Sequence, residues 1–181
     1  MQAQAQQSMM NRLMGIITFK APVYKEVAED KSATTTALII VVVVAVLTGL
    51  ITGLIAGNLV FNLVTAVVIQ LVLWVVSSWV LAFVAKQFFK GDTDTGEMLR
   101  ITGYTNIFRI LGIIPVIGGI IGGILQAVAN IIGVREAAGF DTTKALLTAI
   151  IAWVIGLIIA AIITAIFTAI ILVPAMINTT Q

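Results

Sequence analysis

The sequence predicts an all-α integral membrane protein: a bundle of five transmembrane helices preceded by an amphipathic interfacial segment. Three observations carry this prediction. The 54 residues from Ser32 to Ala85 contain no charged side chain, which leaves room for two helices of about 20 residues and a turn. The chain is 60% hydrophobic and 10% charged, with a mean hydropathy of +1.15. A soluble domain of 181 residues cannot bury so much apolar surface, so lipid must solvate much of it.

The composition also excludes several classes of function. The chain contains neither Cys nor His, so we expect no disulfide, no metal site of the Cys/His type and no cofactor. Without His, and without a carboxylate inside the apolar segments, we expect no enzymatic activity. The net charge of +2 is too small and too dispersed for nucleic-acid binding.

The N-terminal segment, residues 1–33, is expected on the cytoplasmic side of the membrane. Its apolar residues fall on one face of a helix over residues 8–19: Met9, Leu13, Ile16 and Ile17. This pattern is typical of a helix lying in the membrane interface. Pro22 then starts a second short amphipathic helix. A solvated tether and a membrane-docked segment both remain open here.

Five membrane spans are expected within residues 34–173, followed by a short external tail over residues 174–181. The predicted spans are residues 34–57, 59–85, a short amphipathic helix over 97–109, 116–134 and 145–173. The signals that bound them are Gly57 and Asn58 as a turn, Asp92 or Asp94 as a helix cap, Gly112 and Pro115 as a break, Asp141 or Thr142 as a cap, and Pro174 as a stop.

The placement of basic residues decides between five spans and four. With five spans and a cytoplasmic N-terminus, eight basic residues share one side: Arg12, Lys20, Lys25, Lys31, Lys86, Lys90, Arg135 and Lys144. Four spans would move Arg135 and Lys144 to the opposite face, against the preference of basic loops for the cytoplasm. We therefore expect the N-terminus inside and the C-terminus outside.

Four stretches of the chain occur in an order that points to a known family. They are Lys25–Ala33 before the first span, Gly96–Tyr104, Arg109–Ile121 and Gly133–Phe140. In order and spacing they resemble the Yip1-domain family over nearly the whole chain after residue 9. The resemblance implies five spans and a cytoplasmic N-terminus, in agreement with the topology inferred from charge.

The resemblance also bears on partners and location. Eukaryotic members lie in secretory-pathway membranes and contact small GTPases of the Rab type. This sequence lacks their long cytosolic N-terminal region and their Asp-Leu-Tyr-Gly-Pro type motif, so small-GTPase binding does not carry over. It is similar to the compact prokaryotic branch, which implies the cytoplasmic membrane of a prokaryote and brings no established activity.

Arg109 is the most informative single residue. Twelve helical residues beyond Glu97 place it about 18 Å deep, where an unpaired charge costs at least about 2.5 to 3.5 kcal/mol. A polar intramembrane cluster could receive it: Thr102 and Asn106 on the same helix face, with Gln70 and Gln126 on neighbouring spans. This cluster has two interpretations, a structural clamp, which we prefer, and a polar or anion-binding chamber.

A second polar stripe consists of Glu97, Arg100 and Tyr104 near the inner interface. An ion pair at this spacing contributes only a few tenths of a kcal/mol, so we expect interfacial anchoring. Because Arg100 can extend to the headgroups and Arg109 cannot, we expect removal of Arg109 to destabilise the protein more.

Small residues recur at four-residue intervals on three of the expected spans. They are Gly49, Gly53 and Gly57; Gly118 with Gly122 and Gly119 with Gly123; and Gly156 with Ala160, Thr164 and Thr168. Such faces let helix backbones approach closely, either within the bundle or against a second subunit.

The sequence leaves two hypotheses for function. The preferred one is a non-enzymatic membrane protein that organises membranes or assembles as a homo-oligomer or with other membrane proteins. The alternative is a small channel or transporter that uses the polar surface around Arg109.

Overall fold

Two helices precede the apolar part of the chain. The computed structural model describes residues 2–114 and 117–179, and the side chains of residues 8–114, 117–166 and 168. Helix α1 covers Gln2–Ile17 and α2 covers Ala21–Glu29, with Pro22 in the first turn of α2. Between them Phe19 has a left-handed φ of 55° and stacks on Phe108, with the ring centroids 5.5 Å apart. The segment is therefore no tether, because it packs on the rest of the molecule.

Helices α3 (Ala33–Ala56) and α4 (Leu59–Phe89) form the expected hairpin. Gly57 has a φ of 76°, and the Asn58 side chain accepts a hydrogen bond from the amide of Phe61, so both turn residues act as predicted. A Cβ added to Gly49 would lie 2.8 Å from the Cα of Leu63. The small residues of α3 therefore allow the two helices to touch along their backbones.

The third predicted helix is correct at its start and wrong in its continuation. Helix α5 covers Thr95–Thr105, and Asp94 caps it: its carboxylate accepts from the Glu97 amide at 2.8 Å, and the Glu97 side chain reaches back to the Asp94 amide. From Asn106 to Ile113 the chain continues as a 3-10 helix, η1, in place of a uniform α-helix. The angular positions expected for an α-helix therefore end at Thr105.

The last two helices are α6 (Ile117–Ala138) and α7 (Thr142–Thr179). Asp141 is the cap, since its carboxylate accepts from the Lys144 amide at 2.9 Å. The expected stop at Pro174 is wrong, because α7 continues to Thr179. A proline costs a transmembrane helix one backbone hydrogen bond, and such helices tolerate it. The expected break at Pro115 and the expected start of a span at residue 116 lie outside the described residues.

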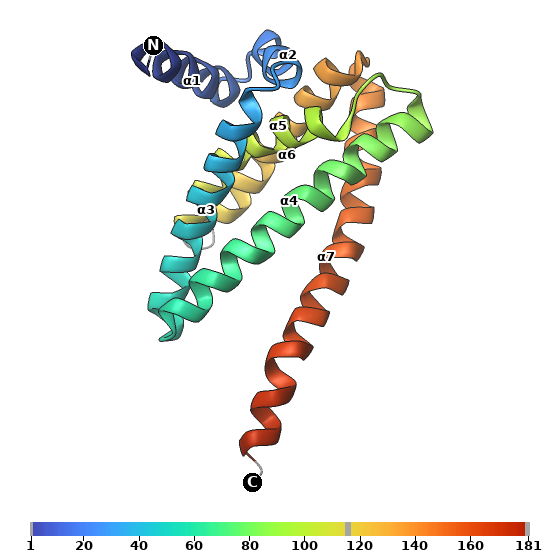
Figure 1. Ribbon diagram of the computed structural model, residues 1–181. Helices are drawn as coiled ribbons and strands as arrows, with labels where there is room; N and C mark the ends of the chain where they lie inside the picture. Colours follow the sequence, from blue (N-terminus) through green and yellow to red (C-terminus); the bar gives the residue numbers. More distant parts are fainter. Residues whose placement is uncertain (1, 115–116, 180–181) are drawn as a thin grey trace.

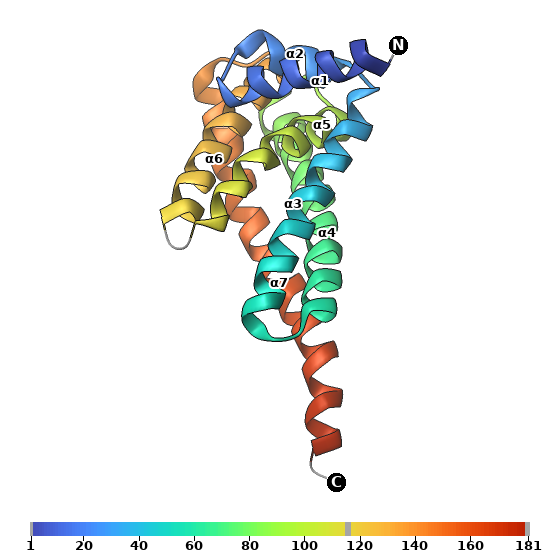
Figure 2. The ribbon, with the colours of Figure 1, turned by 90° about the vertical axis from the view of Figure 1, so that its left-hand side faces the viewer.

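The described part of the chain is helical throughout, without a strand. Four helices are long and apolar enough to cross a membrane: α3, α4, α6 and residues 142–166 of α7. The α5–η1 segment, expected as a fifth span, is not among them. In Figures 1 and 2, α3 and α7 run away from the end that carries α1 and α2, and α4 and α6 run back toward it. The N-terminus and the end of α7 lie at opposite ends of the molecule (Figure 1).

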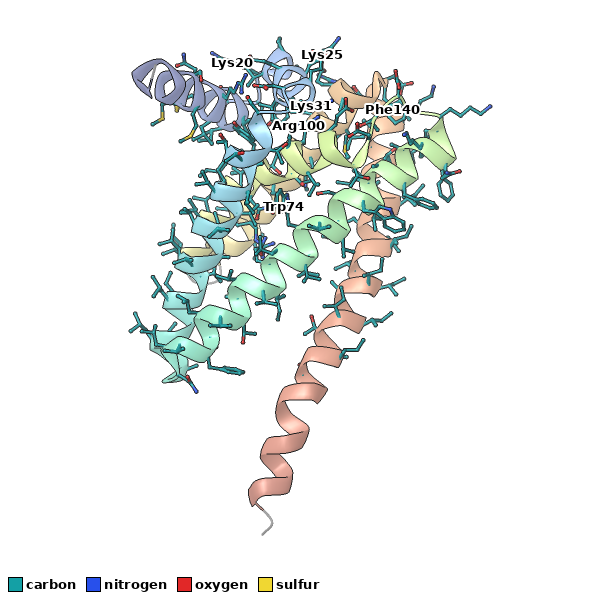
Figure 3. All side chains as sticks on the ribbon, viewed as in Figure 1. Lys20, Lys25, Lys31, Trp74, Arg100 and Phe140 are labelled. Carbon is teal, nitrogen blue, oxygen red and sulfur yellow. The ribbon has the colours of Figure 1, made fainter. Side chains whose placement is uncertain are left out.

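One end of the molecule gathers the charged residues, and we call it the charged end. It comprises α1, α2, the α4–α5 link and the α6–α7 link, and Figure 3 shows Lys20, Lys25 and Lys31 there. Figure 2 shows that the hairpin of η1 and α6 reaches less far from this end than the α3–α4 turn does. The core includes Tyr24, Val41, Met98 and Ile101, all of which are fully buried.

Candidate functional site

A chain of hydrogen bonds joins α4 to α5 and η1 inside the bundle. The Gln70 amide donates to the Asn106 side-chain oxygen at 2.9 Å, and the Asn106 amide donates to the Thr102 carbonyl at 2.9 Å. The Thr102 hydroxyl lies 2.7 Å from the hydroxyl of Ser78. Gln70, Thr102 and Asn106 therefore come together as predicted, and each meets a polar atom where lipid would offer none.

A second link joins α5 to α6. The Thr105 hydroxyl, fully buried, donates to the Asn130 side-chain oxygen at 2.7 Å. We call the connected residues the polar core: Gln70, Ser78, Thr102, Thr105, Asn106 and Asn130. The polar core therefore ties α5 to both α4 and α6 by hydrogen bonds between side chains.

Sequence reasoning missed Ser78, Thr105 and Asn130. A usable signal existed on α4, because Gln70, Trp74 and Ser78 are spaced by four residues and share one face. The Trp74 indole uses this face as well and donates to the Leu99 carbonyl at 3.1 Å (Figure 3). On α6, the sequence alone does not show whether Gln126 or Asn130 meets α5. Only the folded structure identifies Asn130 as the partner of Thr105.

Arg109 and Gln126 do not join the polar core, which corrects the prediction of a five-residue cluster. The Arg109 side chain is exposed, and neither residue has a hydrogen bond or ion pair to another described residue. The reason is the change to a 3-10 helix at Asn106, which ends the α-helical phase that aligned Arg109 with Thr102. Nothing in this arrangement of the described residues favours the channel alternative.

Arg100 is a buried structural residue, which corrects its prediction as an interfacial anchor. Arg100 is only 6% exposed. Its Nε, at 2.7 Å, and its Nη2 both donate hydrogen bonds to the carbonyl of Ala28. Ala28 lies in the last turn of α2, where carbonyls lack helical partners and attract cations. Arg100 therefore fastens α2 to α5 (Figure 3).

Tyr104 and Glu97 also differ from the predicted anchors. Tyr104 is fully buried, and its hydroxyl has no hydrogen-bond partner in the described part of the chain. Glu97 belongs to the cap of α5 and accepts a hydrogen bond from the Thr93 hydroxyl at 2.7 Å. The predicted stripe is therefore split between the core, the α2 contact and a helix cap.

Ion pairs hold the two N-terminal helices together. Arg12 contacts Glu26 at 2.8 Å and Asp30 at 2.7 Å, and the Tyr24 hydroxyl donates to the Ile16 carbonyl at 2.9 Å. Burial opposes the charge of Arg12, but its hydrogen bonds and its attraction to the two carboxylates outweigh burial and raise its pKa. A hydrogen bond from Ser32, assisted by Arg12, lowers the pKa of Asp30 against its partial burial, and burial raises the pKa of Tyr24.

A cavity of about 260 Å³ opens at the charged end between α2 and the two links. Its charged lining is mostly acidic: Lys25, Glu29, Asp92, Glu97 and Glu136. Within the described residues no three Asp or Glu side chains are placed to hold a metal ion.

The small-residue faces divide into packed and open ones. A Cβ added to Gly53 would meet the Cα of Leu59 at 2.8 Å, and one added to Gly122 would meet the carbonyl oxygen of Phe108 at 2.5 Å. Gly118 likewise packs against η1. By contrast, a Cβ added to Gly119, Gly123 or Gly156 would meet no atom of the described residues within 4 Å.

Comparison with known proteins agrees with this architecture. The sequence model of the Yip1 domain matches residues 14–163, from within α1 to within α7. The match spans most of the chain and includes the polar core, and the chain belongs to the Yip1-domain family. No curated protein and no solved structure matches the chain. Membership and the four apolar helices define an integral membrane protein of this family.

Proposed function

We propose that this Yip1-family chain is a non-enzymatic membrane protein that acts by assembling with copies of itself or with other membrane proteins. One observation carries the proposal: α6 has two glycine pairs on different sides. Gly118 and Gly122 pack against η1, whereas a Cβ added to Gly119 or Gly123 would meet no atom of the described residues within 4 Å. We call Gly119 and Gly123 the outer glycine pair.

An outward glycine pair is otherwise a poor choice for a membrane helix. Glycine lowers helix propensity by about 1 kcal/mol relative to alanine and offers lipid no side chain. At a four-residue spacing, however, it lets a second helix approach to backbone contact, which is the principal attraction between helices in lipid. The neighbours Ile120 and Ile124 are 61% and 59% exposed and supply the flanks of such a contact.

Arg109 supports the same proposal from the adjacent element η1. Along α5 and η1 it lies about 20 Å beyond Glu97, counting 1.5 Å per α-helical and 2.0 Å per 3-10 residue. Every Asp and Glu of the sequence lies in α2 or directly after it, in the α4–α5 or α6–α7 link, at the start of α5 or at the end of α6, all at or beside the charged end. A partner that offers a hydrogen-bond acceptor at this depth would relieve the cost of the exposed charge.

The topology that we propose has five crossings, with the N-terminus and the charged end in the cytoplasm. The α5–η1 segment supplies the third crossing: its 11 α-helical and 8 3-10 residues extend for about 32 Å, close to the thickness of a hydrocarbon core. The charged end then collects the basic residues on the inner face. We propose the cytoplasmic membrane of a prokaryote as its location, with α1 and α2 against the inner surface of that membrane.

Photo-crosslinking tests the assembly directly. The chain has no cysteine, so Gly123→Cys can carry a thiol-linked benzophenone as the only reactive group. We expect light to join this position to a second protein in native membranes. The matched control is Val128→Cys, 41% exposed on the same helix but about 140° around it from Gly123, which should crosslink lipid alone. Products from Gly123→Cys that contain lipid alone would contradict the proposal.

A further inference from the structure

An exposed apolar stripe on α1 lies at the charged end. Met10 and Met14 are each 53% exposed and Ile17 is 40% exposed. Their spacings of four and three residues place them on one face of the helix. This stripe differs from the face expected from sequence, because Ile16 of that face is fully buried against the bundle.

The polar contacts of α1 lie on the opposite side from the stripe. Arg12 pairs with Glu26 and Asp30 of the α2 end, and the Ile16 carbonyl accepts from Tyr24. Arg12 and Ile16 are each two residues from Met14, about 200° around the helix. The single charge of α1 is thus turned toward α2 and away from the stripe.

The orientation of α1 gives the stripe a direction. Figures 1 and 2 show α1 lying across the charged end, at a steep angle to α3 and α7. In Figure 3 the sulfur-bearing side chains of α1 project from its lower side, the side along which α3 runs. A helix that lies flat at the ends of the spans, with its apolar side toward their level, has the placement of an interfacial helix.

We propose that the stripe of Met10, Met14 and Ile17 is a lipid-binding surface that sits at the boundary between headgroups and acyl chains of the inner leaflet. This inference rests on the proposed topology, which puts the charged end at that leaflet. Three features select lipid as the occupant: the stripe faces the level of the spans, it carries no charge, and unbranched Met side chains adapt to a fluid surface. Lys20 and Lys31 at the same end can attract anionic headgroups.

Spin-label accessibility tests this surface in the full-length protein. Met10→Cys and Met14→Cys would each carry a nitroxide in vesicles of phosphatidylcholine and phosphatidylglycerol, with Lys25→Cys, at an exposed position of α2, as the water-side reference. Molecular oxygen concentrates in lipid, and a nickel chelate stays in water. We expect several-fold more collisions with oxygen than with the chelate at positions 10 and 14, and the reverse at position 25.

Two results would overturn the inference. One is a chelate accessibility at positions 10 and 14 equal to that at position 25, which would mean that the stripe faces water. The other is protection from both reagents with spin–spin broadening that dilution by unlabelled protein removes, which would mean that a second copy covers the stripe. Neither result depends on the mass of the assembly, so failure here is distinguishable from failure of the proposed assembly at α6.

Discussion

The guanidinium of Arg100 on α5 and the carbonyl of Ala28 on α2 are joined by two hydrogen bonds across 72 positions of sequence. The bond satisfies a helix-end carbonyl with a charged donor inside the protein. It makes α2 part of the bundle. The stability of the charged end therefore depends on a residue that the sequence suggests is a surface anchor.

Replacing Arg100 with Leu should destabilise the protein more than replacing Arg109 with Leu. The first change strands the buried carbonyl and removes charged hydrogen bonds, at a cost of about 2 to 3 kcal/mol. The second removes an exposed side chain that has no partner among the described residues. Thermal unfolding in one detergent measures the difference. Equal midpoints for the two variants would contradict the role assigned to Arg100, and Arg100→Lys should recover part of the loss.

The bond between Gln70 and Asn106 should show a measurable coupling. A double-mutant cycle with Gln70→Leu and Asn106→Leu isolates the pair, and hydrogen bonds between membrane helices give about 0.6 to 1.7 kcal/mol in such cycles. Reversible unfolding in mixed micelles provides the free energies. Gln126→Leu is the control, since Gln126 has no described partner, and it should not couple to Asn106. Strict additivity of the Gln70 and Asn106 changes would mean that this hydrogen bond does not stabilise the bundle.

Acid should loosen α1 from α2. The pKa of Asp30 is lowered in the folded protein, by the Ser32 hydrogen bond first and by Arg12 as well. A carboxylate of this kind stabilises the fold above its unfolded pKa of about 3.9 and stops doing so as the pH falls through its lower folded pKa. Hydrogen exchange of α1 should therefore accelerate in that acidic window.

A matched pair of variants isolates Asp30 in this response. With Asp30→Asn, hydrogen exchange of α1 should already be fast at neutral pH and should change little with acidification. Glu29→Gln should retain the acid response, because the ion pair of Glu29 among the described residues, with Lys25 at 3.9 Å, joins two exposed side chains. An unchanged acid response in Asp30→Asn would assign the effect to other groups.

Single cysteines should report five crossings. An impermeant thiol reagent added outside whole cells should label Leu59→Cys beside the α3–α4 turn and a cysteine near Gln181. It should leave cysteines near Gln6 and at Asp92 unlabelled until the membrane is opened. Each label reports the side of the membrane on which one helix end lies, and the charged end is predicted to lie inside. Labelling near Gln6 and near Gln181 from the same side would rule out an odd number of crossings.

Local signals predicted much of the fold. Gly57 and Asn58 marked the α3–α4 turn, and Asp94 and Asp141 marked two helix starts, because caps and left-handed turns depend on neighbouring residues alone. Gln70, Thr102 and Asn106 met because polar residues in apolar spans must find one another.

The predictions that failed depended on distant or cumulative effects. Nothing near Arg100 reveals that the Ala28 carbonyl lies above it, since the contact exists only after α2 folds over α5. Arg109 was misplaced because an α-helical phase was extended into residues that form a 3-10 helix. Of the small residues, only the fold separates the packed Gly122 from the open Gly123, although they are adjacent in sequence.

The mass of the protein in native-like bilayers tests the central claim most directly. The chain alone has a mass of 19.2 kDa, and we predict that native mass spectrometry from nanodiscs finds it in a larger assembly. Gly123→Leu should reduce that assembly to the folded monomer, whereas Ile124→Leu, an exposed neighbour on the same helix, should leave it intact. A wild-type protein found only at the monomer mass, without a partner, would contradict the account.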